Sequence, residues 1–329
     1  MDVFLASTPF QLMGCTEARH HFGSQDYRLL VVRPDNKTTV RQMRFLLDEF
    51  GWPRDRVIWL SKVTFYPKVA ALLRRLRRQP IDIVYVGNRG SWLQEIIYLS
   101  LQANSLMFLD DGIGSTVLYY RDARAGKSKS RIPDRKRRLL ALLGLRIDAK
   151  DRSGPLTFFS CFPLVSLEAV QVVQHDFPAF RQHFGLSDAP DDRNRGSDVG
   201  YLGQRHGKTE LRRQLVQHLT KLRQRHPAPS RIVYLMHRKQ TRDDIEDILH
   251  ASGVEAQKSR LPIEIEVALA KTRFKAFYGF TSTALYTLKV MFPWLDVYQI
   301  EDPLVAAAVH YPPEMSDLFR QAGVLNTVL

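Results

Sequence analysis

The sequence contains little cysteine and no long apolar run. Its 329 residues include two cysteines, Cys15 and Cys161, which excludes a disulfide-rich scaffold and is typical of a reduced, cytoplasmic protein. No apolar stretch reaches the roughly 18 residues that a membrane-spanning helix needs. The first residues carry neither a basic leader nor a small-residue cleavage site, so no signal peptide is predicted.

Motifs for metals and for bound cofactors are also missing. The ten histidines and two cysteines do not follow metal-ligand spacing. No glycine-rich stretch matches a phosphate-binding or dinucleotide-binding loop. Asp110 and Asp111 are adjacent in the chain, so their side chains diverge more than a shared metal would prefer. We therefore expect neither a metal nor a cofactor.

Acidic residues are outnumbered by basic ones. The chain has 34 Asp and Glu against 48 Lys and Arg, which gives a net charge of +14 at pH 7. This excess indicates an anionic partner, and nucleic acid, an anionic membrane surface or an acidic substrate would each satisfy it. Residues 121–138 hold nine of the cations and form either a solvated face or a contact for an anionic acceptor or membrane.

Short apolar runs alternate with amphipathic stretches in both halves of the chain. Strands separated by helices in this way predict parallel sheets covered on both faces. The expected strands are residues 3–6, 28–32, 56–59, 81–86, 105–109, 200–203, 231–235, 275–278 and 295–300. The expected helices are residues 9–21, 38–50, 66–78, 91–102, 208–223, 241–250, 262–270 and 282–290.

A polar, turn-rich stretch at residues 187–198 separates the two series and predicts a linker. The sequence thus predicts an α/β protein with two Rossmann-like, doubly wound domains that face a central cleft. Their expected limits are residues 1–190 and 198–329, with the last helix as a candidate for returning to the first domain. Because such sheets bind ligands beyond the carboxyl ends of their strands, we expect the site in the loops after the strands.

The loop after the fifth expected strand carries two carboxylates. Asp110 and Asp111 precede Gly112, and a carboxylate in this place can accept a proton from a hydroxyl group or can simply cap a turn. Two loops on the same side of the first sheet carry polar residues that either line the site or cap the following helices. These are Thr8 with Gln11, and Asn88 with Arg89.

Two loops of the second half carry groups that suit a phosphate. His237 and Arg238 follow the strand at 231–235 and either hold an anion or are solvated residues before a helix. Thr281, Ser282 and Thr283 stand at the start of an expected helix, where hydroxyl and N–H groups form an anion site or an ordinary helix cap.

In their order along the chain, these motifs resemble those of bacterial sialyltransferases, especially glycosyltransferase family 52 and the related bacterial polysialyltransferases. That group carries an acidic-acidic-Gly motif, a His-Pro motif and a Ser/Thr motif. The matching segments are Asp-Asp-Gly at 110–112, His-Arg at 237–238 and Ser-Thr at 282–283. Further similarity lies in Ser-Thr-Pro-Phe-Gln at 7–11, Tyr-Leu-Gly-Gln at 201–204 and Leu-Pro-Ile-Glu at 261–264. Arg238 departs from the pattern, because the family has proline there.

The resemblance implies a GT-B fold and an inverting, metal-independent transfer of a sialic acid or a related nonulosonic acid. The donor would be a CMP-sugar, and the acceptor a hydroxyl of a cell-surface glycan such as lipopolysaccharide or capsule. Asp110, with Asp111 beside it, would deprotonate the acceptor, and His237 would hold the leaving phosphate. The donor-binding residues would be Gly203, Gln204, Arg238, Pro262, Glu264, Thr281, Ser282 and Thr283. The acceptor side would be lined by Thr8, Gln11, Asn88 and Arg89.

Two alternatives stay open. The donor can be another CMP-linked acid, such as Kdo, pseudaminic or legionaminic acid, because these share the phosphate site. A basic RNA-binding protein is the alternative from another class, although the sequence has no RRM-like or KH-like motif. The expected partners are a CMP-sugar and an anionic or membrane-linked glycan, without nucleic acid. The expected location is the cytoplasm, with peripheral contact at the inner membrane.

Overall fold

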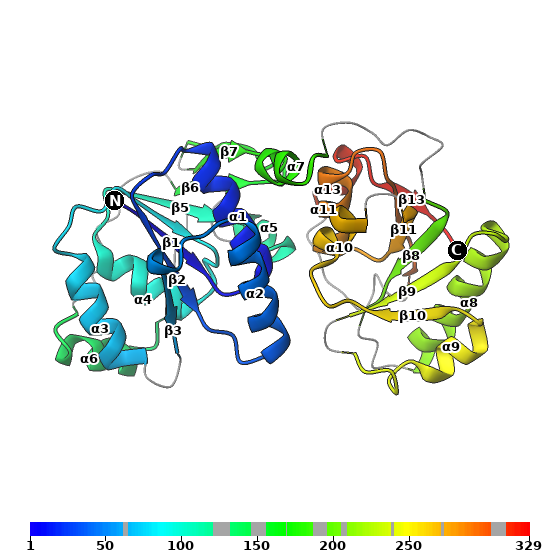
Figure 1. The fold of residues 1–329 in the computed structure, drawn as a ribbon, viewed down its shortest axis with the longest axis horizontal. Coiled ribbons are helices and arrows are strands. Elements are labelled where there is room, and N and C mark those ends of the chain that lie inside the picture. Colours follow the sequence, from blue (N-terminus) through cyan, green and yellow to red (C-terminus); the bar gives the residue numbers. More distant parts are fainter. Residues whose placement is uncertain are drawn as a thin grey trace. The chain divides into compact units, whose positions relative to one another are not determined.

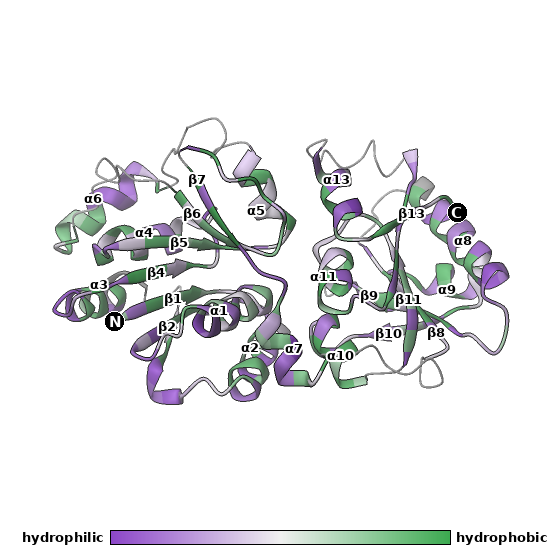
Figure 2. Ribbon diagram, turned by 90° about the horizontal axis from the view of Figure 1, so that it is seen from above, coloured by the Kyte–Doolittle hydropathy of each residue, from purple (hydrophilic) through white to green (hydrophobic). Residues whose placement is uncertain are grey.

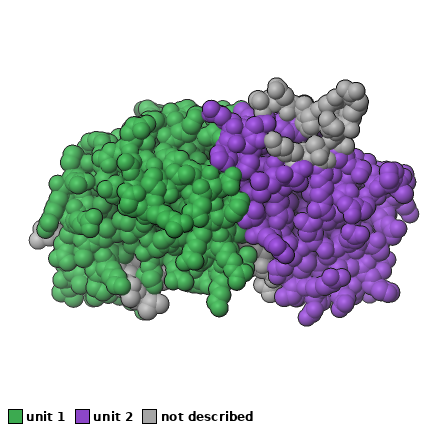
Figure 3. Space-filling view, viewed as in Figure 1, with its two compact units in different colours: residues 1–180 green, residues 181–329 purple. Residues whose placement is uncertain are grey.

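The computed structural model describes residues 1–61, 65–120, 132–145, 156–168, 170–186, 196–204, 209–237, 240–270, 273–303 and 314–329. The chain divides into two compact units, Met1–Phe180 and Arg181–Leu329 (Figures 1 and 3). The sequence predicts a first domain that ends at residue 190 and a second domain that begins at residue 198. Most of the predicted linker, residues 187–195, lies outside the described residues.

Unit 1 contains a seven-stranded parallel sheet in the order β3-β2-β1-β4-β5-β6-β7 (Figure 1). Its strands are β1 Asp2–Ala6, β2 Tyr27–Val32, β3 Val57–Leu60, β4 Ile83–Val86, β5 Ser105–Leu109, β6 Leu156–Ser160 and β7 Val170–Gln174. Its helices are α1 Pro9–His21, α2 Lys37–Glu49, α3 Phe65–Leu76, α4 Trp92–Leu101, α5 Ile113–Leu118 and α6 Asp134–Leu142, with a short 3₁₀ turn η1 at Arg54–Arg56. Helix α7 Pro178–Phe184 contains the boundary between the units.

Unit 2 contains a six-stranded parallel sheet in the order β10-β9-β8-β11-β12-β13. Its strands are β8 Asp198–Leu202, β9 Ile232–Met236, β10 Glu255–Lys258, β11 Phe274–Gly279, β12 Asp296–Ile300 and β13 Leu325–Thr327. Its helices are α8 Thr209–Arg225, α9 Glu246–Ser252, α10 Ile263–Ala270, α11 Thr283–Met291 and α13 Glu314–Gln321. Within the described residues, no helix combines the length and the apolar character that crossing a bilayer requires.

The prediction of two doubly wound parallel-sheet domains is confirmed. The expected helix at 9–21 and the expected strand at 105–109 match α1 and β5 residue for residue. Strands β6, β7, β10 and β13 were not predicted, and β7, β10 and β13 lie at the sheet edges, where polar residues interrupt the apolar pattern. The helix expected at 241–250 begins only at Glu246. Helix α13, the candidate for returning to the first domain, contacts β13 and lies within unit 2.

The central strands are mostly apolar because helices cover both faces of each sheet. In Figure 2 central strands such as β5 are mostly green, whereas the edge strand β10 is largely purple and helices such as α2 and α8 carry both colours along their length. In unit 1, Phe4 of β1 stacks on Tyr85 of β4 with ring centroids 4.3 Å apart, and Trp52 meets Phe4 edge-on. In unit 2, the rings of Tyr201 and Tyr234 stack across β8 and β9 at 5.7 Å.

Side-chain caps begin several of the helices that follow strands. Thr8 caps α1, Asn36 caps α2, Ser91 caps α4 and Ser282 caps α11, each by accepting a backbone N–H group of the first turn. Each cap satisfies a donor that the helix leaves open. These helices therefore start directly at the carboxyl edge of their sheet, where their N–H groups can meet a ligand.

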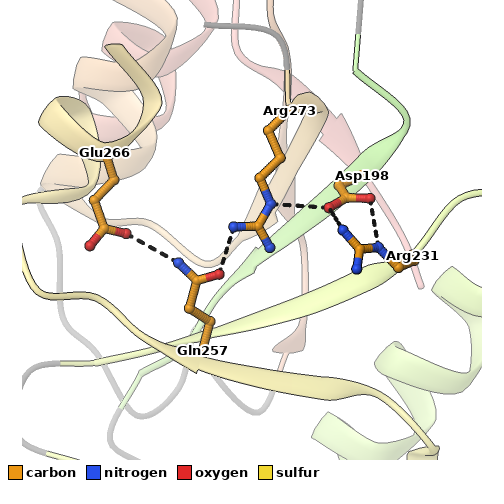
Figure 4. Close-up of polar contacts among 5 residues, drawn as sticks. All are labelled: Asp198, Arg231, Gln257, Glu266 and Arg273. Atoms are coloured by element: carbon orange, nitrogen blue, oxygen red, sulfur yellow. Dashed lines mark hydrogen bonds and ion pairs between the residues drawn. The ribbon is translucent and has the colours of Figure 1, made fainter. Parts of the chain in front are cut away.

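One buried carboxylate ties together the amino ends of three strands in unit 2. Asp198 opens β8, and Arg231 beside β9 donates to its two oxygens at 3.2 and 2.8 Å (Figure 4). Arg273 beside β11 donates to Oδ2 at 3.1 Å and also to Gln257 of β10 at 2.8 Å. Burial by itself raises the pKa of Asp198, but the hydrogen bonds from the two guanidinium groups outweigh it and hold the pKa below its usual range.

Replacing Asp198 by Asn should destabilise unit 2 by about 2–3 kcal/mol at neutral pH, because two arginines lose a buried counter-ion. Urea unfolding measures the effect. Asp317→Asn, which removes an exposed partner of Arg320, is the matched control and should change stability by less than about 0.5 kcal/mol. Since the native pKa is lowered, the difference should be complete at neutral pH and should disappear as pH falls through that pKa. A difference that does not depend on pH would contradict the role of the charge.

Candidate functional site

The strand order of unit 1 reverses between β1 and β4, which are neighbours in the sheet. Connections leave these two strands toward opposite edges of the sheet, so their carboxyl ends open into a crevice where ligands of such sheets bind. The first turn of α1, which follows β1, and the loops after β4 and β5 supply Gln11, Asn88 and Asp111. The structure therefore places three residues of the predicted site at the switch point of the sheet.

Gln11 is the centre of a hydrogen-bonded group that we call the unit 1 cluster, made of Ser7, Gln11, Asn88, Gln94 and Asp111. The Gln11 side chain is fully buried. Its Oε1 accepts from Ser7 N at 2.8 Å, Ser7 Oγ at 2.9 Å and Gln94 Nε2 at 3.1 Å. Its Nε2 donates to Asp111 Oδ1 at 2.5 Å. One amide thus joins the loop after β1, helix α4 and the loop after β5.

Asp111 is half-buried and receives an amide hydrogen on each oxygen. Gln11 donates to Oδ1, and Asn88 Nδ2 donates to Oδ2. Asn88 is itself held by its backbone N–H, which donates to Gln94 Oε1 at 2.9 Å. The two donors fix the direction of the carboxylate. Gly112 follows with φ of +70°, a conformation that glycine adopts without strain.

Asp110 lies deeper than its neighbour and faces the adjacent strand. It is 4% exposed. Its Oδ1 accepts from Ser160 Oγ at 2.9 Å, and its Oδ2 accepts from the backbone N–H of Cys161 at 2.7 Å. Burial raises the pKa of Asp110 to about 6, although both hydrogen bonds oppose the shift. Asp110 therefore ties the end of β5 to the end of β6, and its role as general base stays a prediction.

Two other predicted acceptor-side residues have contacts of their own. Thr8 Oγ1 accepts the N–H of Gln11 at 3.3 Å as the cap of α1. The Arg89 guanidinium lies over the rings of Phe108 and Phe158, at 5.4 and 6.0 Å from their centroids. Thr8 thus positions Gln11 for the unit 1 cluster, and Arg89 packs on the aromatic side chains of β5 and β6.

The switch point of unit 2 lies between β8 and β11. Here Gln204, Gln240, Thr281 and Gln299, with the backbone of His237, form what we call the unit 2 cluster. Gln240 Nε2 donates to the carbonyl of Gln204 at 2.8 Å, and its Oε1 accepts from His237 N at 2.8 Å. Gln204 Nε2 donates to the carbonyl of Thr281 at 3.4 Å, and Gln299 Nε2 donates to Thr281 Oγ1 at 3.1 Å. The loops after β8, β9 and β11 are thereby connected.

Helix α11 begins at this cluster. Ser282 Oγ accepts the N–H of Leu285 at 3.2 Å, and Thr283 is the first helical residue. Thr281, Ser282 and Thr283 are all half-buried, so hydroxyl and backbone N–H groups stand together at a helix N-terminus. Gln299 Oε1 is buried and has no hydrogen-bond partner among the described residues. The arrangement can therefore accept a phosphate and donate or accept hydrogen bonds beside it.

The remaining donor-side predictions have varied surroundings. Gly203 leaves room for the ring of Tyr234, which a Cβ atom would approach to 2.6 Å. Pro262 precedes α10 and is half-buried. Glu264 is buried, hydrogen-bonds to Thr287 of α11 at 2.6 Å and has a pKa that burial raises, so it connects α10 to α11. Arg238 lies outside the described residues.

Sequence reasoning missed the buried glutamines Gln94, Gln240 and Gln299. The signal was present in part, because Gln94 and Glu95 interrupt a mainly apolar helix and a buried amide needs partners. The part of the basic run at residues 121–131 lies outside the described residues. In the described part, Arg135 and Arg138 are exposed, and Lys136 lies over the ring of Trp92 at 3.1 Å.

Among the residues that the structure describes, no group of three or more His, Cys, Asp or Glu side chains could hold a metal ion. This observation concerns these residues alone, and the expected metal independence stays a prediction.

No protein-family model matches the chain, and no curated protein matches it. Several solved structures are similar to the chain. The UDP-GlcNAc 2-epimerase from Neisseria meningitidis bound to UDP-GlcNAc is 11% identical with a TM-score of 0.54, covering 98% of this chain and 90% of that chain. The UDP-GlcNAc 2-epimerase from Methanocaldococcus jannaschii in complex with UDP-GlcNAc and UDP is 8% identical with a TM-score of 0.51, covering 100% and 89%.

A sialyltransferase from Photobacterium damselae, residues 113–497 corresponding to its GT-B domain, is 11% identical with a TM-score of 0.46 and full coverage of both chains. The two epimerases are similar enough to show the fold. Together with the two doubly wound sheets, they establish that the chain has the GT-B fold.

The pKa of Asp110 predicts how the stability of unit 1 depends on pH. Because the native pKa is raised to about 6, ionisation costs stability, and the contribution present at low pH is lost as pH rises through 6. Asp110→Asn cannot ionise. Its stability relative to wild type should therefore rise by roughly 2–3 kcal/mol between pH 4 and pH 7.5.

Urea unfolding at several pH values gives this difference and cancels the contribution of the other titrating groups. Asp48→Asn, at an exposed partner of Arg54, is the control and should follow the wild-type profile. Parallel profiles for wild type and Asp110→Asn would rule out a buried carboxyl with a raised pKa.

Proposed function

We propose that this protein is an inverting, metal-independent glycosyltransferase that uses a CMP-linked acidic sugar. One observation carries the proposal: each unit brings a hydrogen-bonded polar group to the switch point of its sheet, and the two groups differ in chemistry. Unit 1 offers a fixed carboxylate, Asp111. Unit 2 offers hydroxyl, amide and N–H donors around Thr281–Thr283. A base and an anion site are the two requirements for moving a sugar from a phosphate to a hydroxyl.

The donor phosphate binds in unit 2. Ser282 and Thr283 offer hydroxyl groups, and the first N–H groups of α11 offer donors at the positive end of the helix. His237 follows β9 at the same edge and donates to the phosphate, while Gln240 orients its backbone. Gln299 Oε1 accepts from a hydroxyl or amino group of the nucleotide. These donors stabilise the negative charge that develops as the bond from the sugar to the phosphate breaks.

The acceptor is activated in unit 1. Asp111 accepts the proton of the acceptor hydroxyl as its oxygen attacks the anomeric carbon, and the leaving electron pair goes to the phosphate of CMP. Gln11 and Asn88 hold the carboxylate in place during this step. The half-buried Asp111 suits this role better than Asp110, whose oxygens bind Ser160 and Cys161. Asp110 then positions the loop that carries the base.

The nature of the donor rests on the motif resemblance, which favours a CMP-linked sialic acid. The fold neighbours bind UDP-GlcNAc or UDP, so a uracil nucleotide is the main competitor. Kdo, pseudaminic and legionaminic acid are the other acids that a CMP donor can carry. The acceptor is expected to be an anionic or membrane-linked glycan, and the protein is expected to act in the cytoplasm, next to the inner membrane.

Thermal shift with nucleotides tests the donor site. CMP should raise the unfolding temperature more than UMP or UDP at equal concentration, because a ligand of the native state stabilises it by mass action. Gln299→Leu and Ser282→Ala should each weaken CMP binding by about tenfold. Thr220→Val, which removes an exposed hydroxyl from α8, is the control and should bind as wild type. Preferential binding of UDP would show that the donor is a UDP-sugar and not a CMP-sugar. Binding of RNA without binding of any nucleotide would refute the proposal that the protein is a glycosyltransferase.

Transfer kinetics of single variants distinguish the proposed roles of Asp110 and Asp111. Asp111→Asn should lower kcat by roughly 10²–10⁴-fold with unchanged CMP binding, because a general base contributes about that much. Asp110→Asn should retain most of the activity, since its amide can still accept from Cys161 and donate to Ser160. Transfer to a glycan acceptor measures both variants. If Asp110→Asn is inactive while Asp111→Asn is active, the base is Asp110.

Activity should be unchanged in EDTA, because donors of the protein alone stabilise the leaving phosphate in the proposed mechanism. Rates with chelator, and after adding back Mg²⁺ or Mn²⁺, measure this. A rate that collapses in EDTA and returns with the divalent ion would refute the metal-free mechanism.

A further inference from the structure

Unit 1 has a second polar site on the carboxyl edge of its sheet, next to the unit 1 cluster. A cavity of about 510 Å³ lies beyond the ends of β2 and β3. Arg33 follows β2 directly, and its backbone N–H donates to the carbonyl of Leu60, the last residue of β3, at 2.9 Å. The cavity therefore opens at the same edge of the sheet as Asp111, and within the same unit.

The cavity is strongly basic. Four cations line it, Arg33, Lys37, Arg41 and Arg44, against one carboxylate, Asp35. All four cations are exposed, and they exceed the single carboxylate of the lining by three positive charges (four minus one). The start of α2, which Asn36 caps, adds the positive end of a helix dipole to the same place. An excess of unneutralised positive charge in a concave surface attracts and holds an anion.

Its position relates the cavity to the proposed base. Strands of a sheet lie about 4.8 Å apart, and β2, β1, β4 and β5 are consecutive neighbours. The end of β2 thus lies roughly 15 Å from the end of β5, where Asp111 stands. An extended ligand can place one group at Asp111 and an acidic group in the cavity, whereas a ligand of the size of a single sugar cannot.

We propose that Arg33, Lys37, Arg41 and Arg44 form an anion-binding subsite that holds a carboxylate or phosphate group of an elongated acidic glycan acceptor. The binding of an anion follows from the cavity itself, and its assignment to the acceptor rests on the proposed function. The acceptor is accordingly an oligosaccharide with an acidic group some sugar units away from the hydroxyl that reacts.

The test compares two variants that each remove two charges. Lys37→Gln/Arg41→Gln alters the cavity. Arg75→Gln/Arg78→Gln is the control. Both residues are exposed, Arg75 in the last turn of α3 and Arg78 just after it, and α3 runs back toward the amino edge of the sheet. The probes are trigalacturonate, which carries carboxylates, and inorganic tripolyphosphate, which carries phosphates. Calorimetric titration at low and at physiological salt gives the affinities.

Wild type and the control pair should bind at least one probe, and the cavity pair should bind it about tenfold more weakly with a shallower salt dependence. The probe that binds identifies the acidic group as carboxylate or phosphate. Lys37→Arg/Arg41→Lys, which keeps both charges, should retain most of the affinity. Equal affinity of cavity and control pairs would overturn the subsite, since only the net charge would then matter.

Nucleotide binding separates this inference from the proposed function. The cavity pair should bind CMP as wild type does, because the unit 2 cluster is unchanged, and should raise the KM for an acidic glycan acceptor without changing the KM for the donor. A cavity that binds the probe in a protein that binds no nucleotide would refute the transferase but keep the anion site. An unchanged acceptor KM would refute the assignment to the acceptor.

Discussion

All strands of each sheet run parallel, and this constraint determines where chemistry can occur in the molecule. Every strand of a sheet ends at one edge, and every following loop begins there, so residues far apart in the sequence meet at that edge. Gln11, Asn88 and Asp111 follow three different strands of unit 1 and still share hydrogen bonds. The opposite, amino edge of the unit 2 sheet carries charges that stabilise the fold, namely the ion pairs of Asp198 with Arg231 and Arg273.

Buried amides turn this proximity into fixed geometry. A glutamine that is cut off from water must have partners for both its oxygen and its nitrogen, because an unpaired polar group in the interior costs about 1–3 kcal/mol. Gln11 meets this demand by joining Ser7, Gln94 and Asp111, and Gln240 meets it by joining Gln204 and His237. The same demand that stabilises the loops therefore orients the carboxylate in unit 1 and the α11 loop in unit 2. Among the described residues, Gln299 Oε1 is a buried amide oxygen without a hydrogen-bond partner.

The net charge of +14 does not show which cations have a structural role and which line a cavity. Some arginines stabilise the fold. Arg231 and Arg273 form ion pairs with Asp198, and Arg89 packs over the rings of Phe108 and Phe158. Others line the cavity beyond β2 and β3, where four cations face one carboxylate, Asp35. The net charge therefore combines cations that hold the fold together with cations that gather in one cavity, and the two groups have different surroundings.

The sequence alone determined the alternation of strands and helices, the two doubly wound domains and the loops that hold Asp111 and Thr281, because apolar period, turn residues and caps are local properties. Edge strands such as β10 and β13 were not predicted from the sequence, because their residues are mostly polar and only pairing with a neighbouring strand makes them strands. Tertiary structure alone decided the difference between Asp110 and Asp111. Adjacent residues of one strand end point to opposite sides, so one is buried against Ser160 and Cys161, and the other meets Gln11 and Asn88.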